Sequence, residues 1–318
     1  MIAFLFPGQG SQTVGMARGF AEQFETSRAV FEEADRALGE PLSDLILTGP
    51  AEKLTLTENT QPAILTASIA IYRALEARGC RPDIVAGHSL GEYSAHVAAG
   101  TISFRDAVCI VRHRGRYMQE AVPVGTGAMA AILGLDSAGV DQACRDAAAG
   151  EVVSAANLNG PSQIVIAGAA AAVARAVEAA KALGAKRAVP LQVSAPFHCA
   201  LMKPAQDRLE PELRTLPARA PRIPVVANVD AEPKRDAAEA INALVAQIAS
   251  PVRWDDVMRR LVAEGVTGFV EVGPGTVLSA LAKKSARGAT VLNVAEPADL
   301  AAVEELFAAA RAETSASS

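Results

Sequence analysis

Residues 83–95 read DIVAGHSLGEYSA, the most informative local pattern of the chain. A short apolar run leads into Gly87-His88-Ser89-Leu90-Gly91, and a helix-like segment follows directly. The pattern G-x-S-x-G between a strand and a helix is typical of a nucleophile elbow, in which a tight turn presents the serine hydroxyl at a helix N-terminus. The alternative is that Ser89 only caps an ordinary buried helix. A nucleophilic role for Ser89 therefore depends on a base elsewhere in the chain.

Strand-like and helix-like patterns alternate on both sides of this stretch. Strands are expected at residues 2–6, 84–88, 223–229, 268–272 and 289–294. Helices are expected at residues 60–78, 90–99 and 104–122. This alternation predicts an α/β fold with a parallel sheet, and the elbow lies at the edge where ligands bind in such sheets.

The middle of the chain shows a different order of elements. The pattern predicts strand, helix, strand, strand, helix and strand in turn, at residues 127–133, 136–149, 152–157, 163–167, 169–184 and 186–192. The order βαββαβ is the ferredoxin-like arrangement. We therefore predict a main domain from residues 1–124 and 196–312, an inserted ferredoxin-like small subdomain from residues 125–195, and a flexible tail from residues 313–318.

Composition and charge argue against several classes of protein. The 318-residue chain carries 30 Lys and Arg against 35 Asp and Glu, for a net charge of −5, and its basic residues are dispersed. This distribution indicates neither a nucleic-acid partner nor an anionic membrane surface. The apolar start MIAFLF ends at Pro7 without a basic leader, and no other run approaches the length of a membrane span. The four cysteines lack zinc-ligand spacing, so we expect a cytoplasmic protein with reduced thiols and no metal site.

A base for Ser89 has to be found among four histidines. His88 adjoins Ser89 and should point to another side of the elbow, and His96 lies about 10 Å further along the same helix. His113 falls on the polar face of the next predicted helix, which is typical of a solvated histidine. His198 remains, in VSAPFHCALM, where the chain re-enters the main domain.

His198 has an immediate neighbour that offers a competing interpretation. Cys199 follows it directly and could form a Cys/His pair with it, although adjacent residues on a loop usually point apart. No carboxylate lies close to His198 in the sequence, so a backbone carbonyl could orient its ring instead. We therefore favour His198 as the base for Ser89.

One arginine lies on the apolar face of a predicted helix. When residues 104–122 are placed on a helical wheel, Arg112 and Arg116 fall on the polar face, whereas Arg114 falls among the apolar residues. A buried guanidinium stays charged and needs an anion or hydrogen-bond acceptors. It could form a structural ion pair with a buried acid. It could instead hold a substrate carboxylate as a bidentate fork, which predicts an acyl group with a free carboxylate on Ser89.

A glycine-rich loop, FPGQGSQ at residues 6–12, follows the first strand. In a parallel sheet this loop emerges at the same edge as the elbow. Its glycines allow the backbone to approach a ligand closely, and Gln9 could aim a hydrogen-bond donor at an oxyanion.

Several motifs in a fixed order carry a resemblance to a known family. They are PGQGSQ at 7–12, TQPA at 60–63, GHSLGEYSA at 87–95, RHRGRYMQEAVP at 112–123, NLNGPSQIVIAG at 157–168, SAPFHCALM at 194–202 and EVGPG at 271–275. Together they resemble the malonyl-CoA:acyl carrier protein transacylases, a family of acyltransferases, over nearly the whole chain. The resemblance implies an α/β-hydrolase-like core with a parallel sheet and an inserted ferredoxin-like small subdomain.

The resemblance also implies roles for residues of this sequence. Ser89 would be the nucleophile and His198 its base. Arg114 would hold the malonyl carboxylate. The backbone N–H groups of Gln9 and Leu90 would form the oxyanion hole.

Two further positions follow from the same resemblance. The main-chain carbonyl of Gln247 would orient His198 in place of an acid. Phe197 would crowd the α-carbon of the acyl group and so disfavour methylmalonyl.

The activity implied is transfer of malonyl from malonyl-CoA to the phosphopantetheine thiol of acyl carrier protein, through a malonyl-serine ester, for fatty acid or polyketide synthesis. We expect a monomer without a cofactor, because the phosphopantetheine belongs to the carrier. The alternatives are a serine carboxylesterase or thioesterase, a malonyltransferase subunit of malonate decarboxylase, and a non-enzymatic carrier-docking scaffold. A hydrolase is disfavoured because neither an HGGG loop nor an acid partner for the histidine is evident.

Overall fold

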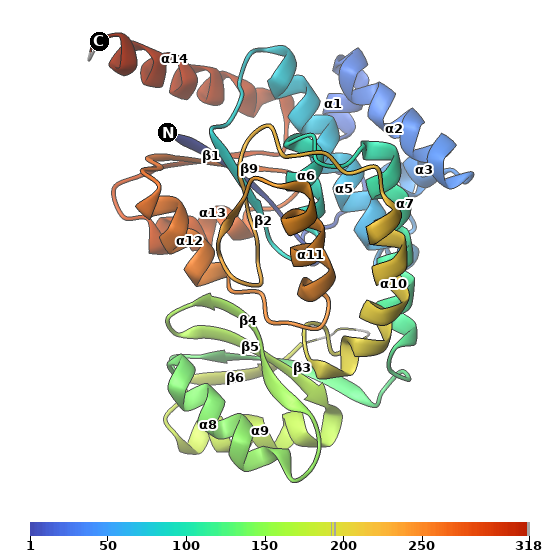
Figure 1. Ribbon diagram of the computed structural model, residues 1–318, viewed down its shortest axis with the longest axis vertical. Coiled ribbons are helices and arrows are strands. Elements are labelled where there is room, and N and C mark those ends of the chain that lie inside the picture. The colour runs from blue at the N-terminus through green and yellow to red at the C-terminus, as the bar shows by residue number, and fades with distance from the viewer. Residues whose placement is uncertain (192, 194, 317–318) are drawn as a thin grey trace.

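Two β-sheets organise the chain (Figure 1). The computed structural model describes residues 1–191, 193 and 195–316. Within these residues it shows an α/β fold with a mixed, mainly parallel sheet of six strands and a separate antiparallel sheet of four. The predicted α/β class with a parallel sheet is therefore confirmed at this level.

The larger sheet has β1 near its centre. Its strands, in sheet order, are β10 (Thr290–Val294), β9 (Gly268–Val272), β1 (Ile2–Phe6), β2 (Ile84–Gly87), β7 (Val225–Val226) and β8 (Pro233–Lys234). All pairs are parallel except β7 with β8. Phe4 and Phe6 pack in one buried cluster and Ala3 and Leu5 in another, because successive side chains of a strand point to opposite faces. This burial on both faces explains the uninterrupted apolar sequence of β1.

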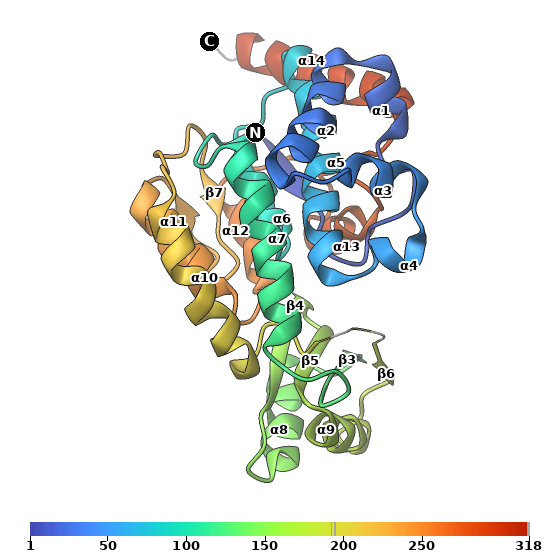
Figure 2. The ribbon, with the colours of Figure 1, turned by 90° about the vertical axis from the view of Figure 1, so that its right-hand side faces the viewer.

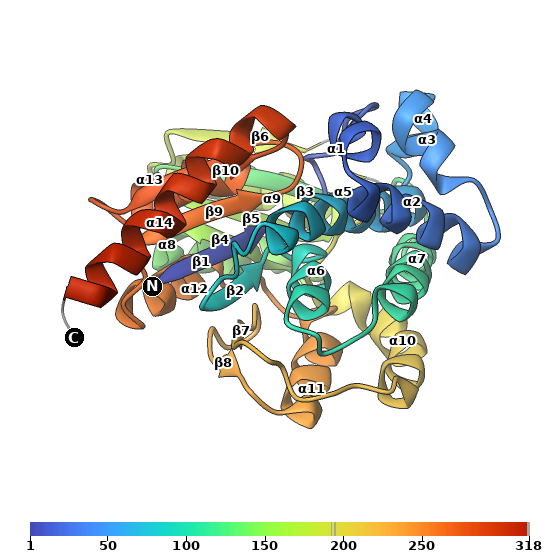
Figure 3. The same ribbon diagram turned by 90° about the horizontal axis from the view of Figure 1, so that it is seen from above.

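Helices cover both faces of this sheet. They are α1 (Arg18–Gln23), α2 (Glu25–Leu38), α3 (Leu42–Thr48), α4 (Ala51–Leu54), α5 (Thr57–Ala77), α6 (Gly91–Ala98), α7 (Phe104–Glu120), α10 (Lys203–Thr215), α11 (Ala237–Gln247), α12 (Trp254–Ala263), α13 (Val277–Ser285) and α14 (Leu300–Ala316). Seen from above, α5 and α6 lie beside the centre of the sheet, with α14 on one side and α7, α10 and α11 on the other (Figure 3). Nearly every residue of α5 up to Leu75 is buried, so this helix forms part of the core.

The predicted strand at 223–229 is shorter than expected. Only Val225 and Val226 form β7. The chain leaves the sheet because the Asn228 main-chain N–H donates to the buried carboxylate of Glu92, at 3.0 Å, instead of to a neighbouring strand. The backbone then turns, with Ala231 at a positive φ of 59°.

The smaller sheet is built from the middle of the chain. Its elements follow the predicted order βαββαβ: β3 (Gly127–Leu133), α8 (Ser137–Ala148), β4 (Val153–Gly160), β5 (Gln163–Ala169), α9 (Ala170–Ala182) and β6 (Arg187–Pro190). The sheet order is β4-β5-β3-β6, with every pair antiparallel. The turn between the second and third strands is tight, because β4 continues through Gly160, beyond the predicted strand end at residue 157, and β5 begins at Gln163.

The small sheet is joined to the core by backbone pairing. The Leu158 N–H donates to the Val252 carbonyl, and the Val252 N–H donates to the Ala156 carbonyl, both at 2.8 Å. Val252 thus adds a short parallel bridge to β4. In Figures 1 and 2 this sheet and its helices, α8 and α9, lie at one end of the molecule, below the α7 and α10 helices.

The end of the chain is more helical than expected. Helix α14 includes residues 313–316, which we expected to belong to a flexible tail, and residues 317–318 lie outside the described part. None of the helices in the described residues has the length and apolar character that crossing a membrane requires.

Candidate active site

Ser89 occupies a sharp turn between β2 and α6. Its φ is 52°, a left-handed conformation that costs energy for a residue with a side chain. The flanking glycines permit this turn: a Cβ on Gly87 would lie 1.9 Å from the Gly91 carbonyl, and a Cβ on Gly91 would lie 2.0 Å from the Phe6 carbonyl oxygen. The sequence G-x-S-x-G therefore forms a tight elbow that presents Ser89 where α6 begins.

Asn228, just after the neighbouring strand β7, holds this turn. Its Oδ1 accepts a hydrogen bond from the Ser89 N–H at 2.7 Å, and its Nδ2 donates to the Gly87 carbonyl at 2.8 Å. Asn228 is fully buried. Sequence reasoning missed it, although a polar residue at the carboxyl end of a predicted strand beside the elbow was an available signal.

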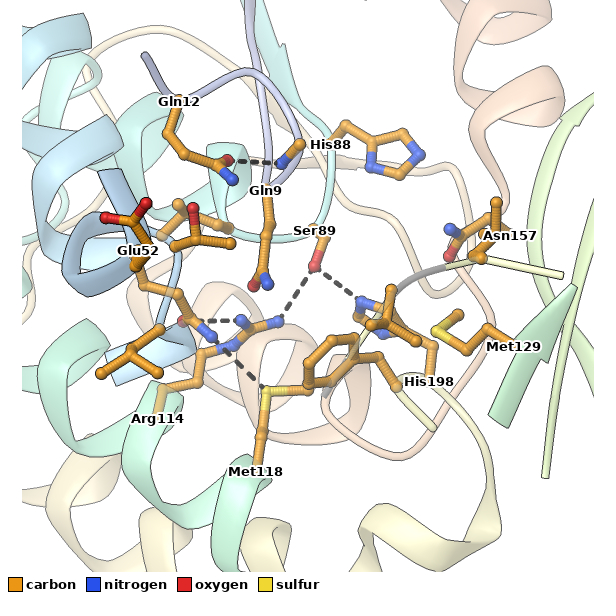
Figure 4. A pocket seen from close by; sticks show the side chains of 18 residues that line it. Gln9, Gln12, Glu52, His88, Ser89, Arg114, Met118, Met129, Asn157 and His198 are labelled. Carbon is orange, nitrogen blue, oxygen red and sulfur yellow. Dashed lines mark hydrogen bonds between the residues drawn. The ribbon is translucent and has the colours of Figure 1, made fainter. Parts of the chain in front are cut away.

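Ser89 and His198 are brought together from positions 109 residues apart. Ser89 Oγ lies 2.6 Å from His198 Nε2 (Figure 4). His198 Nδ1 lies 3.1 Å from the Gln247 carbonyl oxygen. A carbonyl can only accept, so Nδ1 carries the proton and Nε2 presents its lone pair to the serine hydroxyl.

The environment keeps His198 uncharged. Its side chain is buried, and this burial lowers the pKa of the imidazole to about 3, with the nearby positive charge of Arg114 acting in the same direction. At neutral pH the ring is therefore free to accept a proton. The pair Ser89–His198 has the geometry of a nucleophile and its general base.

Arg114 reaches the same point from α7. It is only 2 % exposed, and its Nη2 donates to Ser89 Oγ at 3.2 Å (Figure 4). Two neutral amides hold the guanidinium: Nη1 donates to Gln61 Oε1 and Nη2 to Gln247 Oε1, both at 2.8 Å. No carboxylate in the described residues lies within ion-pair distance of Arg114. Arg114 therefore does not form the direct structural ion pair that was one alternative, and the charge of its guanidinium remains available beside Ser89.

Gln61 is a second residue that sequence reasoning left without a role. It belongs to the TQPA motif and lies almost fully buried in α5, where it borders the cavity. A glutamine in the middle of a core helix needs hydrogen-bond partners, and that requirement was the available signal. Its carbonyl oxygen fixes one nitrogen of the Arg114 fork.

The loop after β1 lies directly against the elbow. A Cβ on Gly8 would lie 2.5 Å from the His88 carbonyl oxygen, so only glycine allows this approach. Gln9 follows Gly8 and borders the cavity together with Leu90, the residue just before α6. The Ser89 N–H donates to Asn228 Oδ1 and is therefore not free to bind an oxyanion. The role of the main-chain N–H groups of Gln9 and Leu90 as oxyanion donors, which the family resemblance implies, stays a prediction. The Gln9 side chain donates to Thr57 Oγ1 at 3.2 Å.

These groups surround a cavity of about 360 Å³. Ser89, His198 and Arg114 lie on its wall, and Phe197 contributes a mostly buried ring next to the histidine. The remaining lining is mixed, with apolar side chains from Leu56, Met118, Met129, Leu191 and Val193. Polar side chains, the Glu52 carboxylate among them, complete the lining, so the cavity combines the Arg114 fork with a wall of mixed polar and apolar character.

The other histidines have partners of their own. His88 Nε2 lies 2.9 Å from Asn159 Oδ1, so the ring points away from the Ser89 hydroxyl as expected. His96 is buried with Nδ1 3.2 Å from Thr101 Oγ1, and burial lowers its pKa to about 3. His113 is not simply solvated, because its Nδ1 lies 2.5 Å from Glu212 Oε2.

Cys199 does not pair with His198. Its Sγ donates to the Pro196 carbonyl at 3.1 Å, and burial raises the pKa of the thiol to about 11. A thiol in this environment stays protonated and is a poor nucleophile. Within the described residues, no group of three or more His, Cys, Asp or Glu side chains is arranged to hold a metal ion.

Comparison with known proteins agrees with this geometry. The sequence profile of a family described as "acyl transferase domain" matches residues 3–307. The chain belongs to the acyl transferase family. It is 52 % identical over 305 residues to the malonyl CoA-acyl carrier protein transacylase of Escherichia coli K12, covering 96 % of this chain and 99 % of the relative. It is 51 % identical over 297 residues to the Bacillus subtilis protein of the same name, covering 93 % and 94 %.

Solved structures of acyl transferases share the fold. An acyl carrier protein S-malonyltransferase from Vibrio cholerae superposes with a TM-score of 0.93 at 49 % identity, covering 95 % of this chain and 99 % of that one. A malonyl-transacylase in complex with a type II PKS acyl-carrier protein gives a TM-score of 0.93 at 47 % identity, covering 96 % and 99 %. The acyl transferase described here therefore has the fold of enzymes that carry malonyl transfer in their names.

Proposed function

We propose that this acyl transferase moves malonyl from malonyl-CoA to the phosphopantetheine thiol of an acyl carrier protein. The observation that carries the proposal is Arg114, a buried guanidinium that has no carboxylate partner among the described residues and lies 3.2 Å from the hydroxyl of Ser89. If Arg114 binds a carboxylate while Ser89 Oγ bonds to a carbonyl carbon, the short distance between the two residues requires both groups to belong to one short acyl group. Malonyl meets this condition because its carboxylate carbon is only two bonds from the thioester carbonyl carbon.

The first half-reaction acylates Ser89. His198 Nε2 takes the hydroxyl proton while Oγ attacks the thioester carbonyl carbon. The resulting oxyanion accepts hydrogen bonds from the main-chain N–H groups of Gln9 and Leu90, at the start of α6. When the tetrahedral intermediate collapses, the carbon–sulfur bond breaks and His198 returns the proton to the departing coenzyme A sulfur.

The second half-reaction runs the same chemistry with a different thiol. The phosphopantetheine thiol of the carrier gives its proton to His198, and its sulfur attacks the malonyl ester. The Ser89 oxygen leaves and is reprotonated by His198. The Gln247 carbonyl keeps the Nδ1 proton in place, so Nε2 remains the atom that exchanges protons in both halves.

Arg114 and Phe197 set which acyl groups react. Arg114 binds a part of the acyl group that does not react, so it supplies position and selectivity. Its distance from Ser89 Oγ favours a three-carbon diacid over a longer one. Phe197 lies beside His198 on the cavity wall, where it would crowd a branch on the α-carbon and disfavour methylmalonyl.

Relatives support the carrier partner and leave two pathways open. The relatives above are named for acyl carrier protein, and one is solved with a type II PKS carrier. We propose that the product supplies extender units for fatty acid or polyketide synthesis. A malonyltransferase subunit of malonate decarboxylase stays an alternative with the same site chemistry, whereas an esterase would give Arg114 no role.

Several broader expectations stay proposals. The sheet order β4-β5-β3-β6 supports a ferredoxin-like small subdomain at residues 125–195, inserted in an α/β-hydrolase-like core from residues 1–124 and 196–312. We also propose a monomeric, cytoplasmic enzyme that needs no cofactor or metal. Coenzyme A and the carrier are its partners, rather than nucleic acid or a membrane.

Mass spectrometry of the intact protein tests the proposed activity. After incubation with malonyl-CoA, a persistent malonyl adduct that is discharged by carrier protein supports a transferase. Turnover of malonyl-CoA without a carrier would indicate a hydrolase, and neither adduct nor turnover would indicate a scaffold. The Ser89→Ala variant serves as the control, because it lacks the hydroxyl that forms the ester.

A further inference from the structure

A buried carboxylate lies behind the active site. Glu92 is on α6, three residues after Ser89, and has no exposed surface. Its Oε2 accepts hydrogen bonds from Gln247 Nε2 at 2.7 Å and from the Asn228 N–H at 3.0 Å. Its Oε1 has no hydrogen-bond partner among the described residues. Glu92 does not border the cavity, so it cannot touch the acyl group.

One amide connects this carboxylate to the arginine. Gln247 Oε1 accepts from Arg114 Nη2 at 2.8 Å, while its Nε2 donates to Glu92 and to the Ser89 carbonyl, the latter at 2.9 Å. An amide has one acceptor end and one donor end, so these partners fix its orientation. The main-chain carbonyl of the same Gln247 holds His198. The Gln247 side chain therefore links Glu92 to the Arg114 fork. Because Gln247 also orients His198 through its main chain, Glu92 holds the residue that positions the base.

Glu92 also offsets charge in the empty site. The charged and titratable groups that face it are Arg114 of α7, Asp230 after β7, Tyr93 on its own helix, and His198 across Gln247. Of these, only the guanidinium carries a positive charge that favours the carboxylate, and Asp230 opposes it. Burial raises the pKa of Glu92 to about 7, so the group can exchange its proton near neutral pH.

We propose that Glu92 is a positioning residue for malonyl selectivity, which holds Gln247 and balances the Arg114 charge until the malonyl carboxylate replaces it. The inference rests on the proposed function, because it requires an anionic acyl group at Arg114. When that second anion arrives, the buried site carries one negative charge too many. Glu92 then takes up one proton from solvent and becomes a neutral carboxylic acid, which restores the balance.

Malonyl binding should depend on pH in one direction. Above pH 7 Glu92 is mostly ionised in the empty site, so malonyl binding must draw a proton from solution. Binding of the malonyl group therefore weakens as pH rises above 7, by up to about tenfold per pH unit. An acetyl group brings no carboxylate, so its binding draws no proton to Glu92.

Proton uptake can be counted by calorimetry. Malonyl-CoA and acetyl-CoA are titrated into the Ser89→Ala protein at about pH 8, in buffers with different ionisation enthalpies. We expect up to about one more proton taken up with malonyl-CoA than with acetyl-CoA. Adding Glu92→Gln should abolish this difference, because the amide oxygen can still accept from Gln247 and Asn228 while the charge is gone.

Glu271 provides a matched control. It is also fully buried and accepts two main-chain hydrogen bonds, from Leu278 at 3.0 Å and Ser279 at 2.7 Å, at the start of another helix. Glu271→Gln should leave the difference in proton uptake unchanged. A purely structural role for a buried glutamate would affect both variants alike and would not change a proton count.

A second measurement needs no variant at Glu92. In the unmodified protein, the ratio of kcat/KM for malonyl-CoA to that for acetyl-CoA should fall as pH rises above 7, because effects of His198 cancel in the ratio. A flat ratio, or an unchanged proton uptake in Glu92→Gln, overturns the inference. Failure of the proposed function looks different, since the unmodified protein would then form no malonyl ester on Ser89.

Discussion

Replacement of Arg114 by alanine tests the central assignment most directly. A carboxylate held by a guanidinium fork gains two charge-assisted hydrogen bonds, each contributing about 1.5–3 kcal/mol. Loss of both should raise the barrier for malonyl transfer by about 3–6 kcal/mol, which lowers kcat/KM by roughly 10²- to 10⁴-fold. The alanine variant also leaves the side-chain Oε1 atoms of Gln61 and Gln247 without the donor that Arg114 provides. The resulting loss of activity is the same for every acyl group.

Acetyl-CoA separates these two effects. Steady-state transfer to carrier protein is measured for malonyl-CoA and acetyl-CoA with the parent, with Arg114→Ala, and with Arg116→Ala, which removes an exposed arginine from the same helix. We expect the malonyl-to-acetyl ratio to fall by at least about a hundredfold in Arg114→Ala only. An unchanged ratio would refute the assignment of Arg114 to the malonyl carboxylate, however much absolute activity was lost.

Three further results are expected. Because burial lowers the pKa of His198 to about 3, acetyl transfer should not decline through protonation of this base between pH 7 and pH 5; a kcat/KM profile that halves near pH 6 would contradict this. Asn228→Ala unpairs the buried Ser89 N–H and Gly87 carbonyl, and should cost about 2–4 kcal/mol of stability in a denaturant titration while slowing malonyl and acetyl transfer by the same factor. The pKa of Glu92 is about 7 in the folded state against 4.5 in the unfolded state, so the folded state loses about 3 kcal/mol of stability as pH rises through these values. Glu92→Gln removes this loss and should therefore raise Tm at pH 8.5 while leaving it nearly unchanged at pH 4.

Local patterns account for the parts of the fold that could be predicted from sequence. The elbow around Ser89 is a contiguous motif, and its glycines are required by contacts within a few residues or with the adjacent strand β1. The order βαββαβ could be predicted because each element has its own periodicity. Arg114 stood out because a helical wheel needs only the residues of α7.

Contacts between distant residues account for what was missed. The hydrogen bonds that join Asn228 to Ser89 and to Glu92 span 139 and 136 positions, and no periodicity within either segment indicates them. The same contacts explain why β7 ends at Val226, since the chain is drawn toward the elbow instead of continuing the sheet. A glutamate inside a helix is usually exposed, and only the folded arrangement shows that Glu92 is buried.

The pairing of Val252 with β4 matters for the construction of chimaeric enzymes. Gln247, whose carbonyl orients the base, and Val252, which hydrogen-bonds to Ala156 and Leu158, lie on one short segment of chain. An exchange of residues 125–195 between homologues would place a foreign β4 edge against this segment. Grafts that also carry residues 247–253 from the donor should therefore keep the base aligned better than grafts of the small sheet alone.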